Sequence, residues 1–202
     1  MPPTSAVSSL PALGWDDRWA CALGELGDPT IGPARVSRVD RGMCTVMTGA
    51  AEVRVPIERD VEVAVGDWVG LAPGPTPGGR SRIVAVLPRR AVFSRSSGAK
   101  GAVPQTVAAN IDTVFVCNAL DGSLSLRHLE RFLALAWQSA ATPVVLITKS
   151  DAVAPGAVTA ALEAVKAVAD GTRVIVVSST TGEGMADLAP YLVAGRTVAL
   201  LG

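Results

Sequence analysis

The type of hydrophobic pattern changes near residue 111, and this change constrains the fold more than any other feature of the chain. Residues 33–87 hold short runs rich in Val, Ile and Thr, several with the apolar–polar alternation typical of half-buried strands. From residue 111 onward, apolar runs of strand length alternate with segments of helical periodicity. The sequence therefore predicts an all-β unit followed by an α/β unit with parallel strands and right-handed crossovers.

The all-β unit is predicted to contain five strands, separated by turn signals such as Gly42, Gly49 and Gly66. Five strands within about 55 residues fit a small barrel, and the oligonucleotide-binding (OB) barrel is the leading candidate because it has five strands and uses basic faces. The expected strands are 33–40, 43–48, 51–57, 67–73 and 81–87.

The segments on either side of the predicted barrel lack a regular period. Residues 1–32 are rich in Pro, Gly and Ser and are predicted as an N-terminal extension, with a mobile start and a short helix or turn packed on the barrel. Residues 88–110 mix Pro, Gly, Ser and basic residues and are predicted as a linker near the basic face. The expected divisions are therefore 1–32, 33–87, 88–110 and 111–202.

The α/β unit should place its ligand site beyond the carboxyl ends of its strands, as open α/β sheets do. The helical periodicity predicts helices over residues 125–140, 154–170 and 184–193. The expected strands are 111–120, 142–148, 172–179 and 196–201.

The second of these strands runs directly into Thr148-Lys149-Ser150-Asp151. A carboxylate such as Asp151 can accept hydrogen bonds from N1–H and the 2-amino group of guanine, whereas adenine lacks both donors and would leave a buried carboxylate unpaired. The Lys149 stem can lie along the base, and the Thr148 hydroxyl can join neighbouring loops. The alternative is a polar turn in which Ser150 or Asp151 starts a helix.

The third strand ends at Ser178-Ser179, whose backbone N–H groups could face the 6-oxo oxygen of guanine. Gly182 and Gly184 allow a tight turn after it. The alternative is an ordinary loop in which Thr181 caps a helix. Two such loops at adjacent strand ends predict guanine recognition more specifically than either loop does alone.

The order and spacing of these motifs resemble the small-ribosomal-subunit-dependent GTPases of the RsgA (YjeQ) family. In this family the guanine-recognition motifs precede the phosphate loop, a circular permutation of the usual order. The resemblance runs over most of residues 33–202. The motifs that carry it are Gly66-Asp67-Trp68-Val69, Ile83 through Leu87-Pro88-Arg89-Arg90, Gln105 through Ala109-Asn110-Ile111-Asp112, Leu129-Glu130-Arg131-Phe132, Thr148-Lys149-Ser150-Asp151, Ser178-Ser179-Thr180-Thr181-Gly182-Glu183-Gly184 and Gly195-Arg196-Thr197-Val198-Ala199-Leu200-Leu201-Gly202.

The resemblance implies an OB barrel that contacts ribosomal RNA, followed by a GTPase domain that binds GTP or GDP with Mg²⁺ and acts on the small (30S) subunit. Thr148 departs from the family, in which Asn is commoner, so affinity is expected to fall while Asp151 keeps guanine selection. Gly202 matches the first Gly of the phosphate loop G-x-x-x-x-G-K-[ST]. The nucleotide-binding residues carried over are Thr148, Lys149, Ser150, Asp151, Ser178, Ser179 and Gly202.

The resemblance also implies parts that these 202 residues do not include. The lysine and Ser/Thr of the phosphate loop, which hold phosphates and magnesium, would follow Gly202. The family's catalytic loops and its zinc-binding carboxy-terminal region would lie further on. We therefore expect no catalytic residue and no metal ligand within the 202 residues, and no GTP hydrolysis by them alone.

Charge is distributed unevenly along a chain that is neutral overall, with 18 basic and 18 acidic residues. Residues 33–100 carry a net charge of +5, which is compatible with a nucleic-acid face or with an ordinary arginine-rich surface. Trp68 could stack on a base or, more in keeping with its position in a strand, lie in the core. The candidate RNA contacts are Arg35, Arg38, Arg41, Arg54, Arg89, Arg90, Arg95 and Lys100.

Several classes are disfavoured by residue usage. Three distant cysteines argue against a disulfide framework or a zinc site and suit a reducing compartment. The absence of a long apolar run or an N-terminal signal predicts a cytoplasmic protein without a membrane partner. A monomer is expected. His128 is the only histidine and falls on a helix, so a Ser-His-Asp enzyme is excluded. A non-enzymatic RNA-binding module remains the alternative to a GTPase, and a G-K-[ST] following Gly202 would discriminate between them.

Overall fold

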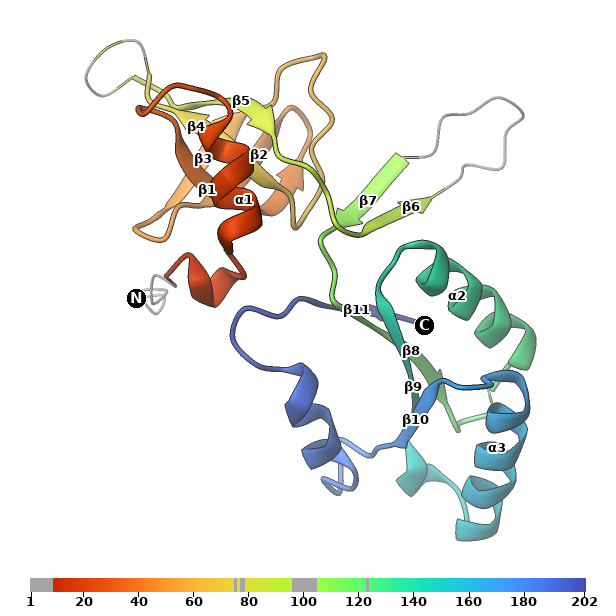
Figure 1. The fold of residues 1–202 in the computed structure, drawn as a ribbon. Helices are drawn as coiled ribbons and strands as arrows, with labels where there is room; N and C mark the ends of the chain where they lie inside the picture. The colour runs from red at the N-terminus through yellow and green to blue at the C-terminus, as the bar shows by residue number, and fades with distance from the viewer. Residues whose placement is uncertain (1–8, 75, 77–78, 96–104, 123) are drawn as a thin grey trace, which may run out of the picture. The chain divides into compact units, whose positions relative to one another are not determined.

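The fold was analysed in a computed structural model that describes residues 9–202 except 75, 77–78, 96–104 and 123 (Figure 1). The chain divides into two compact units, and the boundary along the sequence falls between Asn110 and Ile111. Each unit has a hydrophobic core of its own. Within the described residues, no helix is long and apolar enough to cross a membrane.

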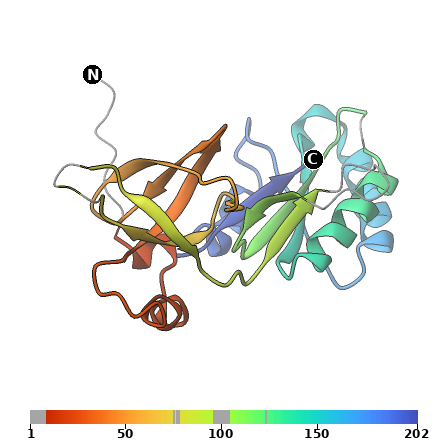
Figure 2. The ribbon, with the colours of Figure 1, turned by 90° about the horizontal axis from the view of Figure 1, so that it is seen from above.

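The first unit is built around a five-stranded antiparallel sheet with the strand order β3-β2-β1-β4-β5. The sheet is strongly curled, and its edge strands β3 and β5 contact each other (Figure 2). Every strand lies within one or two residues of its expected position, because alternation and turn glycines define both its face and its ends. The strands are β1 (Gly32–Asp40), β2 (Met43–Met47), β3 (Glu52–Pro56), β4 (Trp68–Ala72) and β5 (Arg82–Val86).

The concave side of this sheet holds a core of small aliphatic side chains. Alternate residues point inward, so the same strands carry Arg38, Thr45 and Arg54 on the outer side, paired in one row across β1, β2 and β3. A register shift in β1 next to Val36 gives the sheet part of its curl. The buried core residues are Ala34, Val36, Cys44, Val46, Val55, Val63, Val69 and Ile83.

The N-terminal segment forms a 3-10 turn, η1 (Pro11–Leu13), and a helix, α1 (Asp17–Gly24), packed against the sheet. Asp16 caps α1 by accepting a hydrogen bond from the backbone N–H of Arg18 at 3.1 Å. Trp19 on α1 packs against Trp68, which is 0% exposed. Trp68 is therefore a core residue, and the base-stacking interpretation is wrong. The first eight residues, part of the expected mobile start, lie outside the described residues.

The expected linker, 88–110, is not a plain connection, because it contains two antiparallel strands, β6 (Val92–Arg95) and β7 (Gln105–Ala109). A register shift between Phe93 and Ser94 interrupts the pairing, which explains why the sequence shows no regular period there. The two strands belong to the first unit. A Cβ on Gly66, whose φ is 91°, would lie 2.1 Å from the carbonyl oxygen of Ala109, so glycine is required for this close approach.

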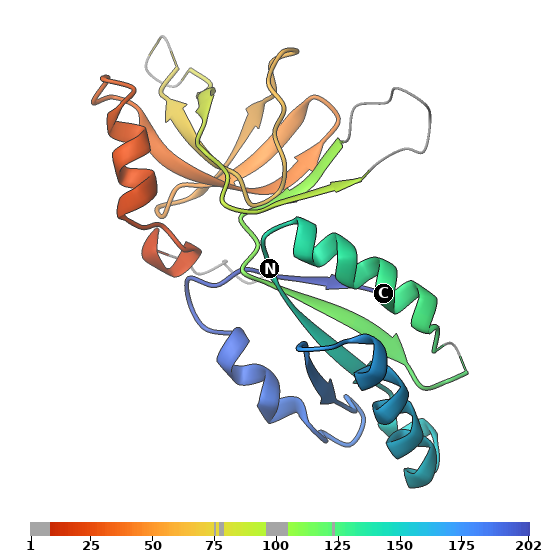
Figure 3. The same ribbon diagram turned by 45° about the vertical axis from the view of Figure 1, so that its right-hand side comes forward.

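The second unit is a parallel four-stranded sheet with the order β10-β9-β8-β11. Helices α2 (Leu126–Gln138) and α3 (Pro155–Val168) cover one face, and the 3-10 segment η3 (Met185–Tyr191) covers the other (Figure 3). The strands are β8 (Thr113–Ala119), β9 (Thr142–Thr148), β10 (Arg173–Val176) and β11 (Val198–Leu201).

The expected helix over 184–193 forms as the 3-10 segment η3 instead of an α-helix. Pro190 lies within it and has no N–H to donate, and Gly184 precedes it in a left-handed conformation. The other expected helices agree with α2 and α3. Since all four strands are parallel, their carboxyl ends meet at one edge of the sheet. Thr148 ends β9 there, and Ser178 and Gly202 follow β10 and β11.

Candidate functional site

The loop after β9 turns sharply at Lys149, whose φ of 60° is in the left-handed region that non-glycine residues seldom adopt. This turn leads into the 3-10 segment η2 (Ser150–Ala152), in which Ser150 is buried and Asp151 is exposed. The turn thus directs Lys149 and Asp151 outward at the sheet edge while Ser150 anchors the loop.

Asp151 is held by the end of the neighbouring strand, a contact that the sequence did not predict. Its Oδ1 accepts a hydrogen bond from Ser178 Oγ at 2.5 Å. Hydrogen bonding, chiefly from the Ser178 hydroxyl, lowers the pKa of Asp151, so the carboxylate stays charged. The sequence predicts a buried carboxylate at this position, whereas Asp151 is exposed in the structure.

The loop after β10 closes on itself around Ser178. The backbone N–H of Ser178 donates to the carbonyl of Glu183 at 3.0 Å, and that of Gly182 donates to the carbonyl of Ser178 at 2.9 Å. The Ser178 N–H is therefore bonded within the loop and does not face outward, contrary to expectation. The Ser178 hydroxyl instead donates a hydrogen bond to Asp151. Ser179, the other predicted residue, is exposed. A Cβ on Gly184 would lie 1.9 Å from the carbonyl oxygen of Val176, so the turn requires glycine there.

Two acidic residues that the sequence did not single out support the loop after β9. Glu183 Oε2 accepts a hydrogen bond from Ser150 Oγ at 2.7 Å. Asp121, which follows β8, forms an ion pair with Lys149. Both residues lie beyond the ends of parallel strands, and this position was the signal that could have found them, although nothing in the sequence paired them with Ser150 and Lys149.

A pocket of about 350 Å³ lies at the same sheet edge, between the ends of β8, β9 and β11 and the first turns of α2. Thr148 and Gly202 both line it, and Thr148 Oγ1 lies 3.5 Å from the carbonyl oxygen of Asn118. A Cβ on Gly202 would approach the carbonyl oxygen of Cys117 to 2.8 Å, so β11 ends in a close backbone contact that favours glycine. The seven predicted nucleotide-binding residues thus lie at one edge in two groups, one around this pocket and one around Asp151.

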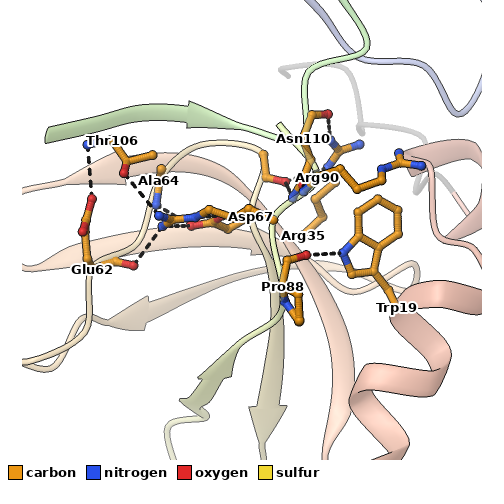
Figure 4. A network of polar contacts seen from close by, with 11 residues as sticks. Trp19, Arg35, Glu62, Ala64, Asp67, Pro88, Arg90, Thr106 and Asn110 are labelled. Atoms are coloured by element: carbon orange, nitrogen blue, oxygen red, sulfur yellow. Dashed lines mark hydrogen bonds and ion pairs between the residues drawn. The ribbon is translucent and has the colours of Figure 1, made fainter. Parts of the chain in front are cut away.

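Arg89, a predicted RNA contact, instead forms hydrogen bonds with other residues of the first unit. Its Nε and Nη2 donate to the two carboxylate oxygens of Asp67, each at 2.8 Å, and it also reaches Thr106 and the carbonyl of Glu62. Asp67 is 0% exposed and also accepts from the backbone N–H of Ala64 (Figure 4). The hydrogen bonds to Asp67 raise the pKa of Arg89. This pair holds the segment 88–110 against the sheet.

Two further predicted RNA contacts are engaged in the same region (Figure 4). Arg35 donates to the carbonyls of Leu13, Gly66 and Asn110, and its guanidinium lies 5.4 Å from the Trp68 ring centre. Arg90 lies 4.2 Å from the Trp19 ring centre and pairs with Asp16. The sequence predicts surface charge at both positions. Arg35 is instead partly buried by its contacts with backbone carbonyls and the Trp68 ring, whereas Arg90 stays exposed while it packs on the Trp19 ring.

The remaining arginine candidates that can be placed are on the outer side of the sheet. Arg38 and Arg54 have side chains 72% and 64% exposed, and both approach Asp40. Arg41 is exposed in the turn between β1 and β2. Arg95 ends β6, and its side chain, like the whole of Lys100, lies outside the described residues.

The carboxyl-end edge of the parallel sheet presents exposed acceptor and donor groups, among them Asp151 and Lys149. A charged, exposed carboxylate with a lowered pKa, such as Asp151, can accept two donors at once. Lys149, two residues before it, pairs with Asp121. No group of three or more His, Cys, Asp or Glu residues within the described part of the chain could hold a metal ion.

Known proteins are similar to this chain in sequence, and solved structures are similar to it in fold. The family described as RsgA GTPase matches residues 86–202. The chain is 41% identical over 203 residues to the "Small ribosomal subunit biogenesis GTPase RsgA" of Streptomyces coelicolor, covering 96% of this chain and 54% of that protein. It is 38% identical over 210 residues to the protein of the same name from Streptomyces avermitilis, covering 99% and 56%. The chain thus spans about half the length of these relatives.

Solved structures resemble the fold at low sequence identity. YjeQ from Thermotoga maritima matches with a TM-score of 0.66 and 21% identity, covering 85% of this chain and 60% of that one. YloQ, described as a circularly permuted GTPase, matches with a TM-score of 0.60 and 18% identity, again covering 85% of this chain and 60% of that one. With the family match covering more than half of the residues and the expected motifs at the strand ends, the chain belongs to the RsgA GTPase family.

Proposed function

We propose that this chain forms the guanine-recognising and RNA-contacting part of a ribosome-stimulated GTPase that acts in late maturation of the small ribosomal subunit. One observation carries the proposal: the hydrogen bond from Ser178 to Asp151, which joins the two strand-end loops that the guanine-recognition motif requires. The names of the relatives, small ribosomal subunit biogenesis GTPases, support the biological setting.

Guanine recognition follows from the chemistry of the Asp151 carboxylate. Its lowered pKa keeps both oxygens as acceptors, which suit the parallel N1–H and 2-amino donors of guanine. The base covers the exposed carboxylate, so an adenine in the same place would remove it from water without returning a hydrogen bond. Lys149 lies along the base, and the N–H of Ser179 faces the 6-oxo oxygen.

The triphosphate and its Mg²⁺ would lie next to Gly202, at the pocket that it shares with Thr148. The 202 residues contain the first glycine of the expected phosphate loop but not its lysine or its Ser/Thr. Mg²⁺ would supply charge neutralisation for phosphoryl transfer, and these residues would contribute the base-recognition edge and Gly202. We therefore expect these 202 residues alone to bind guanine nucleotide weakly and not to hydrolyse GTP.

For the first unit, we propose an OB-type barrel whose outer side contacts ribosomal RNA. The support is the cross-strand row of Arg38, Thr45 and Arg54, with Arg41 in the adjoining turn. These arginines are exposed, unlike Arg35 and Arg89, so they remain able to approach phosphates.

Base recognition is tested by NMR titration of the 202-residue chain with GMP, AMP and XMP up to about 10 mM, a range that suits weak binding. GMP is expected to bind most tightly and to shift the amides around Asp151 and Ser178. In Asp151→Asn, the amide can accept from N1–H and donate to the 2-oxo oxygen of xanthine, so preference should move to XMP. Unchanged GMP preference in this variant would contradict the assignment of Asp151.

RNA contact is tested by binding to small ribosomal subunits at increasing salt. Affinity should fall steeply with salt, and the double variant Arg38→Ala/Arg54→Ala should lower the log–log slope by about 1–2, since each phosphate contact contributes roughly 0.7–0.9. The control is Arg127→Ala/Arg173→Ala, which removes two exposed arginines from the second unit and should leave the slope unchanged. Salt-independent binding or an equal effect of both pairs would argue against this surface. RNA binding without any GMP binding would favour the non-enzymatic RNA-binding module.

A further inference from the structure

We infer that Glu183 is a positioning residue for guanine selection, acting through Ser150 on the orientation of Asp151. The inference rests on the proposed base-recognition site and assigns a role to a residue outside the predicted guanine-binding set. It starts from the 2.7 Å hydrogen bond that Ser150 Oγ donates to Glu183 Oε2.

The loop that contains Glu183 is itself rigidly built. Ser178 accepts hydrogen bonds from Gly182 and Thr181 and donates its N–H to the Glu183 carbonyl, which closes the turn from 178 to 183. The Glu183 N–H also bonds to Thr181 Oγ1. A side chain mounted on such a closed turn can hold a neighbouring loop in place.

This closed turn holds the loop after β9 at two consecutive residues. Ser178 holds Asp151 directly, and Glu183 holds Ser150, which is buried beneath it. Hydrogen bonds from the Ser178 and Thr180 side chains act on the Asp151 carboxylate itself. The backbone of this loop is held less firmly, because the hydrogen bond from the Ser150 N–H to the Val177 carbonyl is long, at 3.4 Å. The Ser150–Glu183 contact fixes this backbone, so the Asp151 side chain projects from a constant position and both carboxylate oxygens keep the direction that a two-donor base needs.

The same contact is also needed by Ser150 itself. A buried hydroxyl without a hydrogen-bond partner has lost its hydration without compensation. Removal of the Glu183 carboxylate therefore favours a different conformation of the loop, in which Ser150 is again hydrogen-bonded. Because Glu183 is exposed apart from this bond, its substitution should not disturb the core of the second unit.

The test compares GMP with IMP, which keeps N1–H and the 6-oxo oxygen but lacks the 2-amino donor. The ratio of their dissociation constants, measured by NMR titration of the 202-residue chain, reports whether both oxygens of Asp151 are aligned. Wild type should prefer GMP by about tenfold, the value of one charge-assisted hydrogen bond. Glu183→Ala should weaken GMP binding by about fivefold or more and bring the ratio close to 1, while Glu183→Gln, whose amide oxygen still accepts from Ser150, should restore both.

Asp187→Ala is the matched control, because it removes an exposed carboxylate from the segment that follows without touching Ser150. Ser150→Ala removes the same hydrogen bond from the other side and should reproduce the loss of ratio. Equal GMP affinity and an unchanged ratio in Glu183→Ala and Ser150→Ala would overturn the inference while leaving Asp151 as the base-binding residue. A wild type that does not prefer GMP to IMP would instead contradict the proposed base site.

Discussion

Arg89 donates two parallel hydrogen bonds of 2.8 Å to the Asp67 carboxylate, which is completely buried in the first unit. The pair joins the start of β4 to the segment that leads out of β5. These contacts explain why a Gly-Asp sequence precedes β4. Gly66 permits the close approach of the Ala109 carbonyl, and Asp67 accepts the hydrogen bonds of Arg89.

Arg89→Ala is expected to destabilise the first unit by about 3 kcal/mol, at the lower end for a broken buried pair because the arginine side chain is 19% exposed. Urea unfolding followed by the fluorescence of the Trp15, Trp19 and Trp68 cluster measures this change. Arg41→Ala, at an exposed turn, should stay within about 0.5 kcal/mol of wild type. Equal stability of the two variants would refute a structural role for Arg89.

Ser178→Ala should raise the pKa of Asp151 toward its ordinary value, because the hydroxyl is the main cause of its lowering. A lowered folded-state pKa means that the contribution to folding is present above the ordinary carboxyl pKa of about 4 and is lost as pH falls through the lowered value. Carboxyl-carbon NMR of Asp151 against pH measures the shift. If the Asp151 titration is the same with alanine at position 178, the Ser178 hydrogen bond does not form in solution.

Gly184→Ala is expected to destabilise the second unit by about 3 kcal/mol, because it combines a left-handed φ of 67° with a Cβ placed on the Val176 carbonyl. Gly182→Ala is the matched control: its φ is 83°, but a Cβ there meets nothing within 4 Å, so only the backbone cost of about 1 kcal/mol applies. Urea unfolding followed by circular dichroism distinguishes them. Similar losses would indicate that the turn relaxes around the added methyl.

Thiol labelling should follow the order Cys21, Cys117, Cys44. Cys21 is exposed on α1, whereas burial raises the pKa of Cys117 and Cys44 and reduces the reactive thiolate at neutral pH. Cys44 lies in the core of the antiparallel sheet, so its reaction requires the first unit to open. Mass spectrometry of peptides after timed labelling gives the order, with the urea-unfolded chain as the control in which all three react. Early labelling of Cys44 would contradict the packing of that core.

The sequence predicted the elements well where local pattern decides them. Period-2 alternation located all five strands of the first sheet, and the change of period at residue 111 identified the parallel unit and its strand ends. It was less successful where pairing is irregular, as in β6 and β7, or where one proline changes the helix type, as in η3. The domain division and the roles of the strand-end residues remain predictions.

What the sequence determined by itself was the order of strands and helices and the identity of the polar residues at their carboxyl ends, because these depend on periodicity over a few residues. Only the tertiary structure decided which polar groups meet: Arg89 with Asp67 across 22 positions, and Ser150 with Glu183 across 33. Such pairs depend on the order of strands in the sheet and on the path of each loop, which place distant residues within hydrogen-bonding reach without leaving a local pattern in the sequence.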